Sequence, residues 1–496
     1  MNSPKKGHLF VRTSLPVLTA MIVALAASVV LTLAGCASSQ GISPHAEPLP
    51  AGQLGMTNTA ATPLAADWWK GFGDNELNGL VQRALAGSPS LHVAQARLLR
   101  AQAGIEAAHA AQGVRVDGEA DAMRQRYSET GIYPPPLAGG IFSSGNVQAT
   151  ASWELDFFGR HRTALDAALG AGRAAEADGQ AARVLIASSV VRAYVQLSRW
   201  LAQREVAGRT LAQRSEVLIL IHQRVDAGLD TTLDLRQGEG ALPEARQQLE
   251  AIDEQIVLAR HSLAALTAQA PNALDGLAPP FPAVQSLAFP ASVPADLVGR
   301  RADIQAARWR VEAATHDVAN ARSQFYPNIN LTALVGLNSI GLDKLFKAGS
   351  EQYGAGPAIH LPIFDAGSLR ANLRGKSADL DAAVETYNGA VIDAVHDVAD
   401  QISSLQYIER QRLQQDQAQV LAEAAYGVAV QRYKAGLGSY LAVLSAESNV
   451  IAQRRSATDL KARVLDTQVA LIRALGGGYV ADSSQAATER GANAPL

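Results

Sequence analysis

The chain has little of what most enzymes and nucleic-acid-binding proteins are built around. Charged residues make up 18% and aromatic residues 5% of its 496 positions. No basic cluster follows the N-terminus, so nucleic acid is not expected as a partner. The single cysteine, Cys36, excludes an internal disulfide and a cysteine-based metal cluster. The ten histidines are scattered without the spacing of metal ligands.

Sequence motifs of catalysis are missing as well. The chain has no HExxH pair, no G-x-S-x-G turn and no phosphate-binding loop. Residues 170–175 resemble a dinucleotide-binding loop by their letters only, because they lie in an alanine-rich helical pattern and follow no strand at the proper distance. We therefore expect no enzyme, no metal and no cofactor apart from a covalent lipid.

What is present begins with a secretion signal. A short basic stretch precedes a long apolar run that ends in LAGC at 33–36, which predicts a signal peptide over residues 1–35. The LAGC quartet resembles a bacterial lipobox, which implies a diacylglycerol and an N-acyl chain on Cys36. Ala37 and Ser38 follow in place of an aspartate, which resembles the class sorted to the outer membrane. A transmembrane anchor with a buried cysteine is the alternative.

The rest of the chain carries an internal duplication. The segment QRVDAGL at 223–229 returns as QRYKAGL at 431–437, and other parallels occur in the same order at a similar offset. A period this long indicates a duplicated domain rather than a solenoid. We expect a lipidated linker at 36–66, a first repeat at 67–290, a second repeat at 291–478 and a polar tail at 479–496. A proline-rich crossing at 271–294 separates the repeats.

Four segments predict strands, because apolar and polar residues alternate along them. The alternation is clean at 146–157 and at 328–338, where only Leu334 breaks the polar face, and it is weaker at 113–128 and 353–364. Their length suits a tilted strand crossing a bilayer, although a half-buried soluble sheet has the same alternation. Four strands cannot close a membrane barrel. Three copies sharing twelve strands are the smallest symmetric solution with room for a lumen.

Two long helices and two tight turns are also predicted. Residues 160–227 and 368–435 contain no proline, and a helix of this length extends for about 100 Å. Gly228 and Gly436 are placed to end these helices in a left-handed turn. Thr231, Thr232 or Ser439 can cap the helices that return. Each half therefore predicts a long helical hairpin, for which ordinary packing without a function is the alternative.

Together these features resemble the TolC-like outer-membrane factor family, and within it the lipoprotein branch of multidrug efflux channels. The resemblance covers nearly all of the mature chain. Its most recognisable stretches are DWWKGFGDNELNGLVQRAL, WELDFFGR, SQFYPNINL, LPIFDAG, QRYKAGLGSYLAVL and ALGGG. It implies a mainly α chain with a membrane β-barrel. A homotrimer would share twelve strands, four from each chain, and a long periplasmic α-helical barrel would continue the channel.

The resemblance also implies roles for residues at the hairpin tips. Leu441 matches an apolar ring that narrows the periplasmic end, and Tyr433 and Asp234 match residues that tie neighbouring hairpins in the closed state. Tip packing or a solvated face is the alternative for each. The tips would contact a periplasmic membrane-fusion adaptor through Arg224, Gly228, Leu229, Arg432, Gly436 and Leu437. The sequence departs from the family at Ala442 and Ser445, where acidic residues are frequent, and at Gly438, where some members have arginine.

The function expected from this resemblance is a passive outer-membrane conduit that exports small molecules and drugs. An inner-membrane pump, reached through the adaptor, would supply the energy. Two other readings stay open at this point. The chain could form the outlet of a type I protein secretion system, or it could be a lipid-anchored periplasmic coiled-coil scaffold without a pore.

Overall fold

The computed structural model describes residues 38–50, 54, 64–281, 293 and 297–479. The predicted signal peptide, the lipidation site Cys36, much of the proline-rich crossing and nearly all of the C-terminal tail lie outside the described residues. No helix in the described ranges has both the length and the apolar content that a membrane span requires.

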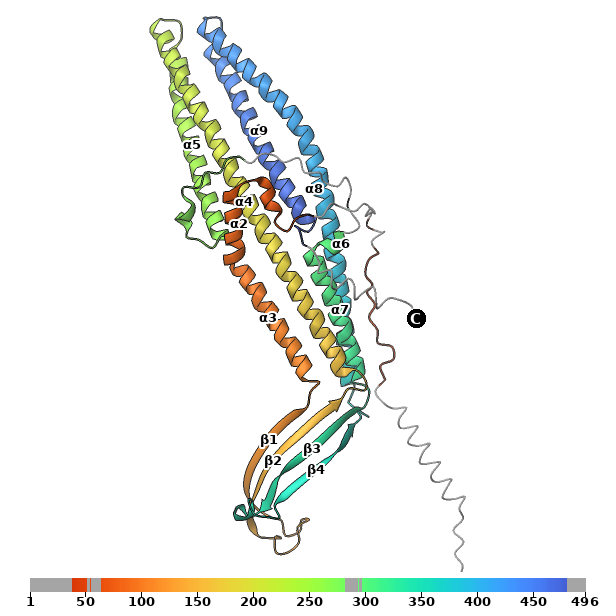
Figure 1. The fold of residues 1–496 in the computed structure, drawn as a ribbon. Coiled ribbons are helices and arrows are strands. Elements are labelled where there is room, and N and C mark those ends of the chain that lie inside the picture. The colour runs from red at the N-terminus through yellow and green to blue at the C-terminus, as the bar shows by residue number, and fades with distance from the viewer. Residues whose placement is uncertain (1–37, 51–53, 55–63, 282–292, 294–296, 480–496) are drawn as a thin grey trace, which may run out of the picture. The chain divides into compact units, whose positions relative to one another are not determined.

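Each half of the described chain carries the same series of elements, which Figure 1 shows in colour order. The first half contains η2 (Trp68–Phe72), α2 (Asn75–Gly87), α3 (Pro89–Ala110), β1 (Arg115–Arg126), β2 (Ile141–Leu155), α4 (Arg160–Asp226), α5 (Thr232–Leu266) and η3 (Pro271–Leu274). The second half contains α6 (Leu297–Arg300), α7 (Ala302–Ser323), β3 (Asn328–Ile340), η4 (Leu342–Lys344), β4 (Glu351–His360), α8 (Ser368–Lys434) and α9 (Tyr440–Ala474).

Corresponding helices in the two halves have the same length. Helices α3 and α7 have 22 residues each, α4 and α8 have 67, and α5 and α9 have 35. The internal duplication predicted from the sequence is therefore confirmed, and the long helices end within a residue of their predicted limits.

The chain divides into two compact units, which are described one at a time. The sheet unit contains the four strands together with the adjoining ends of α3, α4, α7 and α8, and the helical unit contains the remaining parts of the helices.

The sheet unit is built on one antiparallel sheet with the order β1-β2-β3-β4 (Figure 1). Its register places Trp153 opposite Leu331 and Val147 opposite Leu337, so the odd-numbered positions of β2 and β3 share a face. Strand β2 ends at Leu155, so Phe157, which the alternation pattern included in the strand, lies in the following turn. Within the described ranges, β1 and β4 each have one hydrogen-bonded neighbour, which leaves the outer edge of each strand open.

An aspartate accepts from backbone N–H groups at both strand-to-helix turns of the sheet unit. Before α4, the carboxylate of Asp156 accepts from the backbone N–H groups of His161 and Arg162 at 3.1 and 2.8 Å. Before α8, Asp365 accepts from the backbone N–H groups of Gly367 and Leu369 at 3.0 and 2.6 Å. An acidic side chain at a helix start satisfies N–H groups that have no partner within the helix. This chemistry accounts for the aspartate that precedes each long helix, in LDFFGR at 155–160 and in IFDAGS at 363–368.

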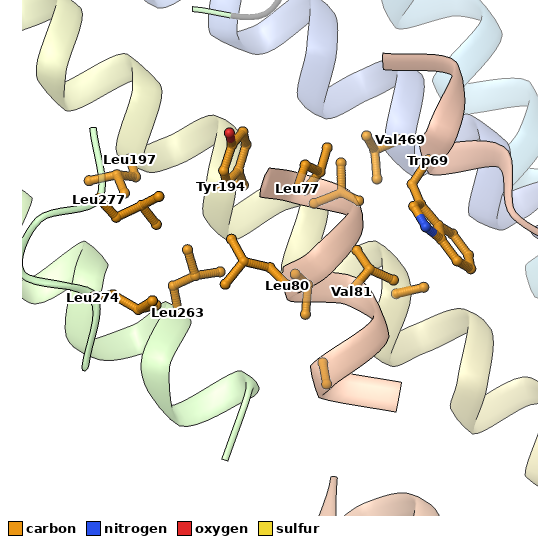
Figure 2. Packing of buried hydrophobic residues seen from close by; sticks show 14 of the residues in the cluster. Trp69, Leu77, Leu80, Val81, Tyr194, Leu197, Leu263, Leu274, Leu277 and Val469 are labelled. Carbon is orange, nitrogen blue, oxygen red and sulfur yellow. The ribbon is translucent and has the colours of Figure 1, made fainter. Parts of the chain in front are cut away.

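The helical unit has its main core where the first short helices pack against the long ones (Figure 2). Leu77, Leu80 and Val81 of α2 lie against Tyr194 and Leu197 of α4, and residues of α5 and α9 complete the cluster. The hydroxyl of Tyr194 donates to the carboxylate of Asp74, which also accepts from the first N–H groups of α2. A second cluster contains Val391, Val395, Val398 and Ile402 of α8, which are spaced four, three and four residues apart and therefore lie on one face of the helix.

Candidate functional site

Both hairpin turns of the helical unit have the same backbone geometry. Gly228 and Gly436 lie in the left-handed region, at φ angles of +69° and +75°. The N–H of Leu229 donates to the carbonyl of Arg224 at 2.8 Å, and the N–H of Leu437 donates to that of Arg432 at the same distance. This closure satisfies carbonyl groups that a helix end would otherwise leave unpaired, and glycine adopts it without steric strain.

The two returning helices start differently. Thr231 precedes α5 and forms a reciprocal capping box with Asp234, in which each side chain accepts from the other residue's backbone N–H, at 3.3 and 3.0 Å. Ser439 precedes α9 in an extended conformation but makes no side-chain capping hydrogen bond. The carboxylate of Asp234 is therefore engaged within the first turn in this subunit.

A side-chain network, which we name the clasp, joins the two hairpins and consists of Arg224, Asp230 and Tyr433. Two guanidinium nitrogens of Arg224 donate to the carboxylate oxygens of Asp230 at 3.0 and 3.1 Å, and a third donates to the carbonyl of Tyr433 at 3.0 Å. The Tyr433 hydroxyl donates to Asp230, and the guanidinium lies 4.6 Å from the centre of the tyrosine ring. Three kinds of contact thus converge on one arginine.

The clasp is largely shielded from water. The side chains of Arg224 and Asp230 are 11% and 10% exposed, and Tyr433 packs with Ile221, Tyr440 and Val443 in a small apolar core. Burial on its own would raise the pKa of Asp230, but hydrogen bonds from Arg224 and Tyr433 outweigh it and hold the pKa below its usual range. Bidentate pairs of this kind, removed from water, have energies that depend on every partner being present.

Exposed leucines lie around the same turns. Leu229 and Leu437, which directly follow the two glycines, are 65% and 69% exposed, and Leu441 in the first turn of α9 is 64% exposed. Contiguous exposed apolar patches mark interaction surfaces, whereas single exposed leucines are common on protein surfaces. The exposure of Leu229, Leu437 and Leu441 in a single subunit is what residues that face a partner or a neighbouring subunit would show.

A second buried charge pair joins the hairpins further from the turns. Arg214 of α4 donates to Glu447 of α9 at 3.1 Å and to Glu244 of α5 at the same distance. The side chains of Arg214 and Glu447 are 12% and 7% exposed. Burial raises the pKa of Glu447, and the pairing with Arg214 opposes this effect only in part.

The two faces of the sheet have opposite chemistry. On one face, Asn146 donates to Asp121 at 3.1 Å, Gln148 donates to Glu119 at 3.1 Å, and Gln352 donates to both amide oxygens at 3.0 and 3.1 Å. The other face carries aliphatic and aromatic side chains that are exposed in the single chain, among them Val116, Val147, Trp153, Leu331, Val335, Tyr353 and Ile359. A sheet with these faces fits between water and an apolar medium.

Comparisons with known proteins agree with this geometry. A profile of the family described as outer membrane efflux protein matches residues 80–269 and 293–477. The multidrug resistance outer membrane protein MdtQ of Escherichia coli O157:H7 is 31% identical over 464 residues, which cover 90% of this chain and 96% of MdtQ. The outer membrane protein VceC of Vibrio cholerae has a TM-score of 0.79 at 35% identity, covering 84% of this chain and 100% of that chain. The chain belongs to the outer membrane efflux protein family.

A further relative is named for resistance to fusaric acid. The fusaric acid resistance protein FusA of Burkholderia cepacia is 35% identical over 364 residues, which cover 71% of this chain and 68% of FusA. These matches confirm the family and the outer-membrane location that were predicted from the sequence. Together with the sheet they also confirm the mainly α fold with four strands per chain.

The predicted tip residues of this outer membrane efflux protein fall into three groups. Leu229, Leu437 and Leu441 are exposed, and Gly228 and Gly436 form the turns. Arg224 was predicted as a contact for an adaptor, but its side chain is turned inward to Asp230. The Arg432 side chain instead reaches back to the carbonyl of Leu437 at 3.4 Å.

Sequence reasoning missed the acidic partner of Tyr433. The resemblance implies that Tyr433 and Asp234 tie neighbouring hairpins in the closed state, and this stays a prediction. Within this subunit, Tyr433 contacts Asp230 and Asp234 forms the capping box. Sequence reasoning also missed Arg214 and Glu447. A charged residue in an otherwise apolar helical seam is the signal that could have identified these two.

Proposed function

We propose that this chain is one subunit of a trimeric outer-membrane channel through which small molecules leave the periplasm. The observation that carries the proposal is the four-stranded sheet, with open outer edges on β1 and β4 and faces of opposite polarity. Unpaired backbone groups in a lipid bilayer cost several kcal/mol each, so such edges have to pair with other strands. Two copies would give eight strands and an interior just filled by side chains, whereas three give twelve and an aqueous lumen.

The direction and the class of cargo follow from the relatives. MdtQ is named a multidrug resistance protein and FusA a fusaric acid resistance protein, which supports export of small organic compounds over export of polypeptides. A pore-free scaffold would leave the exposed apolar face and the polar hydrogen-bonded face of the sheet without a purpose. The channel itself is passive, and the energy for export comes from an inner-membrane pump reached through a periplasmic adaptor.

The hairpin tips provide the control in this proposal. Leu441 narrows the closed end, the clasp of Arg224, Asp230 and Tyr433 holds the two hairpins of one subunit together, and Leu229 and Leu437 contact the adaptor. Opening then requires only that the adaptor bind the open arrangement more tightly than the closed one. Cys36 carries a diacylglycerol and an N-acyl chain in this proposal, and Asp234 ties neighbouring hairpins in the closed trimer.

Planar-bilayer recordings of the purified, lipidated protein test the channel directly. We expect a heat-modifiable trimer with a low resting conductance, and Leu441→Ser should raise that conductance because a small polar side chain no longer narrows the tip. Leu233→Ser, at an equally exposed leucine of the first hairpin, is the matched control. A monomer that conducts nothing would refute the channel, and an unchanged conductance in Leu441→Ser would remove Leu441 from the constriction.

A further inference from the structure

Two ion pairs join helix α4 of the first hairpin to helix α9 of the second, and both lie in the helical unit. Two guanidinium nitrogens of Arg192 donate to the carboxylate oxygens of Asp466 at 2.6 and 3.1 Å. Arg199 donates to the carboxylate of Asp459 at 2.6 Å. In both pairs the cation belongs to α4 and the anion to α9. We name these four residues the ladder.

Buried contacts lie along the same seam between α4 and α9. Gln203 is 5% exposed, and its side-chain amide donates to the carboxylate of Asp459 at 3.0 Å. Between the two ion pairs, Val195 of α4 packs with Ala462 and Leu465 of α9 in a small apolar cluster. The ladder therefore borders a seam in which side chains of the two helices are closely packed.

Equal steps separate the contacts on the two helices. Seven residues separate the two arginines of the ladder on α4, and seven separate its two aspartates on α9. Gln203 lies four residues beyond Arg199. It also donates, at 3.2 Å, to the carbonyl of Arg455, which lies four residues before Asp459. The antiparallel helices thus keep a single register over the whole seam, as a spacing of seven residues on one face allows.

The charges on α9 oppose other registers. A displacement of the helices by one turn would place Arg199 against Arg455 or Arg463, which lie four residues to either side of Asp459. Like charges that face each other destabilise a contact. Arg455 already lies near Arg214, and burial together with this neighbouring cation lowers the pKa of Arg455. A further guanidinium group is therefore unfavourable at this position.

The ladder is better suited to select a register than to add stability. The side chains of Arg192 and Asp466 are 50% and 43% exposed, and those of Arg199 and Asp459 are 27% and 45% exposed. Exposed ion pairs contribute little to the free energy of folding because water and salt screen them. Specificity, by contrast, depends on the difference between registers, and repulsion in the displaced registers enlarges that difference.

We propose that Arg199 is a positioning residue for the channel, which with Asp459 holds α4 and α9 in one register, so that the hairpins open by bending beyond the ladder and not by sliding along each other. The buried pair of Arg214 and Glu447 joins the same two helices nearer the tips. Helix α4 ends at Asp226, so about 18 Å of this helix lies beyond Arg214. The inference rests on the control by the tips in the proposed function, whereas the register itself does not depend on it.

Disulfide formation in the full-length protein measures the register. Val206 and Ala452 continue the register of the ladder toward the tips, and Ser448 and Ser456 lie four residues to either side of Ala452. Val206→Cys is combined in turn with Ala452→Cys, Ser448→Cys and Ser456→Cys. The first pair should form a disulfide at least about tenfold faster than the other two, because one turn displaces the sulfur atoms by about 6 Å. Mass spectrometry of the linked peptides quantifies each pair.

Charge changes test whether the ladder sets this preference. Arg199→Asp should make the two displaced pairs react about two- to fivefold faster, since the new carboxylate is repelled by Asp459 and attracted by Arg455 and Arg463. Arg183→Asp, at an exposed arginine of α4, is the matched control. Adding Asp459→Arg to Arg199→Asp removes the repulsion but presents an arginine in every register, so stability should recover and the preference should not. An unchanged preference in Arg199→Asp, or its full return in the double variant, would overturn the inference.

Conductance distinguishes bending from sliding. The disulfide between Val206→Cys and Ala452→Cys fixes the register and leaves the tips beyond it unlinked. Asp230→Asn breaks the clasp, and the rise in resting conductance that it causes should be the same with and without this disulfide. A rise that the disulfide blocks would refute bending beyond the ladder. A single register in a protein that conducts nothing would reject the channel and leave the ladder, and a conducting trimer in which all three cysteine pairs react equally would do the reverse.

Discussion

The first and second hairpin turns share one backbone and differ in the side chains around it. Both have a left-handed glycine followed by a leucine whose N–H closes the turn at 2.8 Å. The first turn has Asp230 and a capping box. The second has Gly438, and Ser439 at the start of α9 makes no side-chain capping hydrogen bond. In exchange, the second hairpin contributes Tyr433 to the clasp.

This difference explains what the duplication provides. Two identical hairpins would present the same groups to each other, and like charges that face each other destabilise a contact. Here the first hairpin supplies the carboxylate and the guanidinium, and the second supplies the phenol and a helix-end carbonyl. Retained backbone geometry with divergent side chains thus gives two complementary partners, which hold the two hairpins together.

The largest effect is expected where a buried charge joins the two hairpins. Arg214→Met leaves Glu447 buried without its cation, which should lower the free energy of unfolding by about 3–5 kcal/mol. Urea unfolding in detergent, followed by circular dichroism, measures the change. The double variant Arg214→Met with Glu447→Leu should recover most of the loss, because it removes both charges. A double variant no more stable than the single one would contradict this account of the pair.

The next largest effect is expected when the clasp is broken. The same experiment distinguishes the role of Asp230 from that of Asp234. Asp230→Asn should weaken the contact between the hairpins by about 1.5–3 kcal/mol, since it removes the charge that accepts from Arg224 and Tyr433. Resting single-channel conductance should rise. Asp226→Asn, at the exposed acidic residue that ends α4, is the matched control. Asp234→Asn, which alters the capping box and leaves the clasp in place, is the comparison.

A double-mutant cycle sharpens this prediction. If Asp230 and Tyr433 act together, adding Tyr433→Phe to Asp230→Asn should change the conductance little further. Additive effects of the two substitutions would mean that they act independently. A larger effect from Asp234→Asn than from Asp230→Asn would instead favour the tie between Tyr433 and Asp234 that the family resemblance implies.

A smaller effect distinguishes the two helix starts. Thr231→Ala should cost about 1 kcal/mol of stability because its side chain caps α5. Ser439→Ala should stay within about 0.5 kcal/mol because Ser439 makes no side-chain capping bond. Unfolding midpoints of the two variants, measured side by side, check the difference. Equal losses of stability in the two variants would mean that Thr231 and Ser439 stabilise their helices to the same extent.

The features that could be predicted from the sequence are those that local chemistry decides. Gly228 and Gly436 end long runs without proline, and only a left-handed turn fits there, so both turns and both long helices were predicted correctly. The alternation likewise predicted the two faces of β2 and of β3, and the pairing of the strands adds that their apolar faces coincide. Pattern alone did not find the end of β2, because Phe157 continues the alternation although Asp156 already caps the next helix.

The clasp could not be predicted in the same way, because it depends on side chains far apart in the chain. Asp230 and Asp234 lie in the same turn, and which of them meets Tyr433, 203 residues further on, is decided by the packing of Ile221, Tyr440 and Val443 around the ring. The inward turn of Arg224 has the same cause. Sequence spacing places these residues at the tip but does not show which way a long side chain points.

The smallest effect is expected from acidification, which should leave the clasp intact over most of the accessible pH range. The pKa of Asp230 is held below its ordinary value of about 3.9 by Arg224 and Tyr433. A depressed pKa means that this carboxylate stabilises the clasp above that value and that its contribution is lost as the pH falls through the folded pKa. Resting conductance should therefore stay constant from about pH 8 to pH 5 and rise only below about pH 4.

The pH response of Glu447 has the opposite sign, which allows the two groups to be told apart. Its pKa is raised by burial, so protonation removes a buried charge and adds stability as the pH falls through the folded pKa. Conductance measured against pH in Asp230→Asn should lose the rise at low pH, because the titrating carboxylate is gone, while Glu447→Gln should keep it. A rise that persists in Asp230→Asn would assign the acid response to a group outside the clasp.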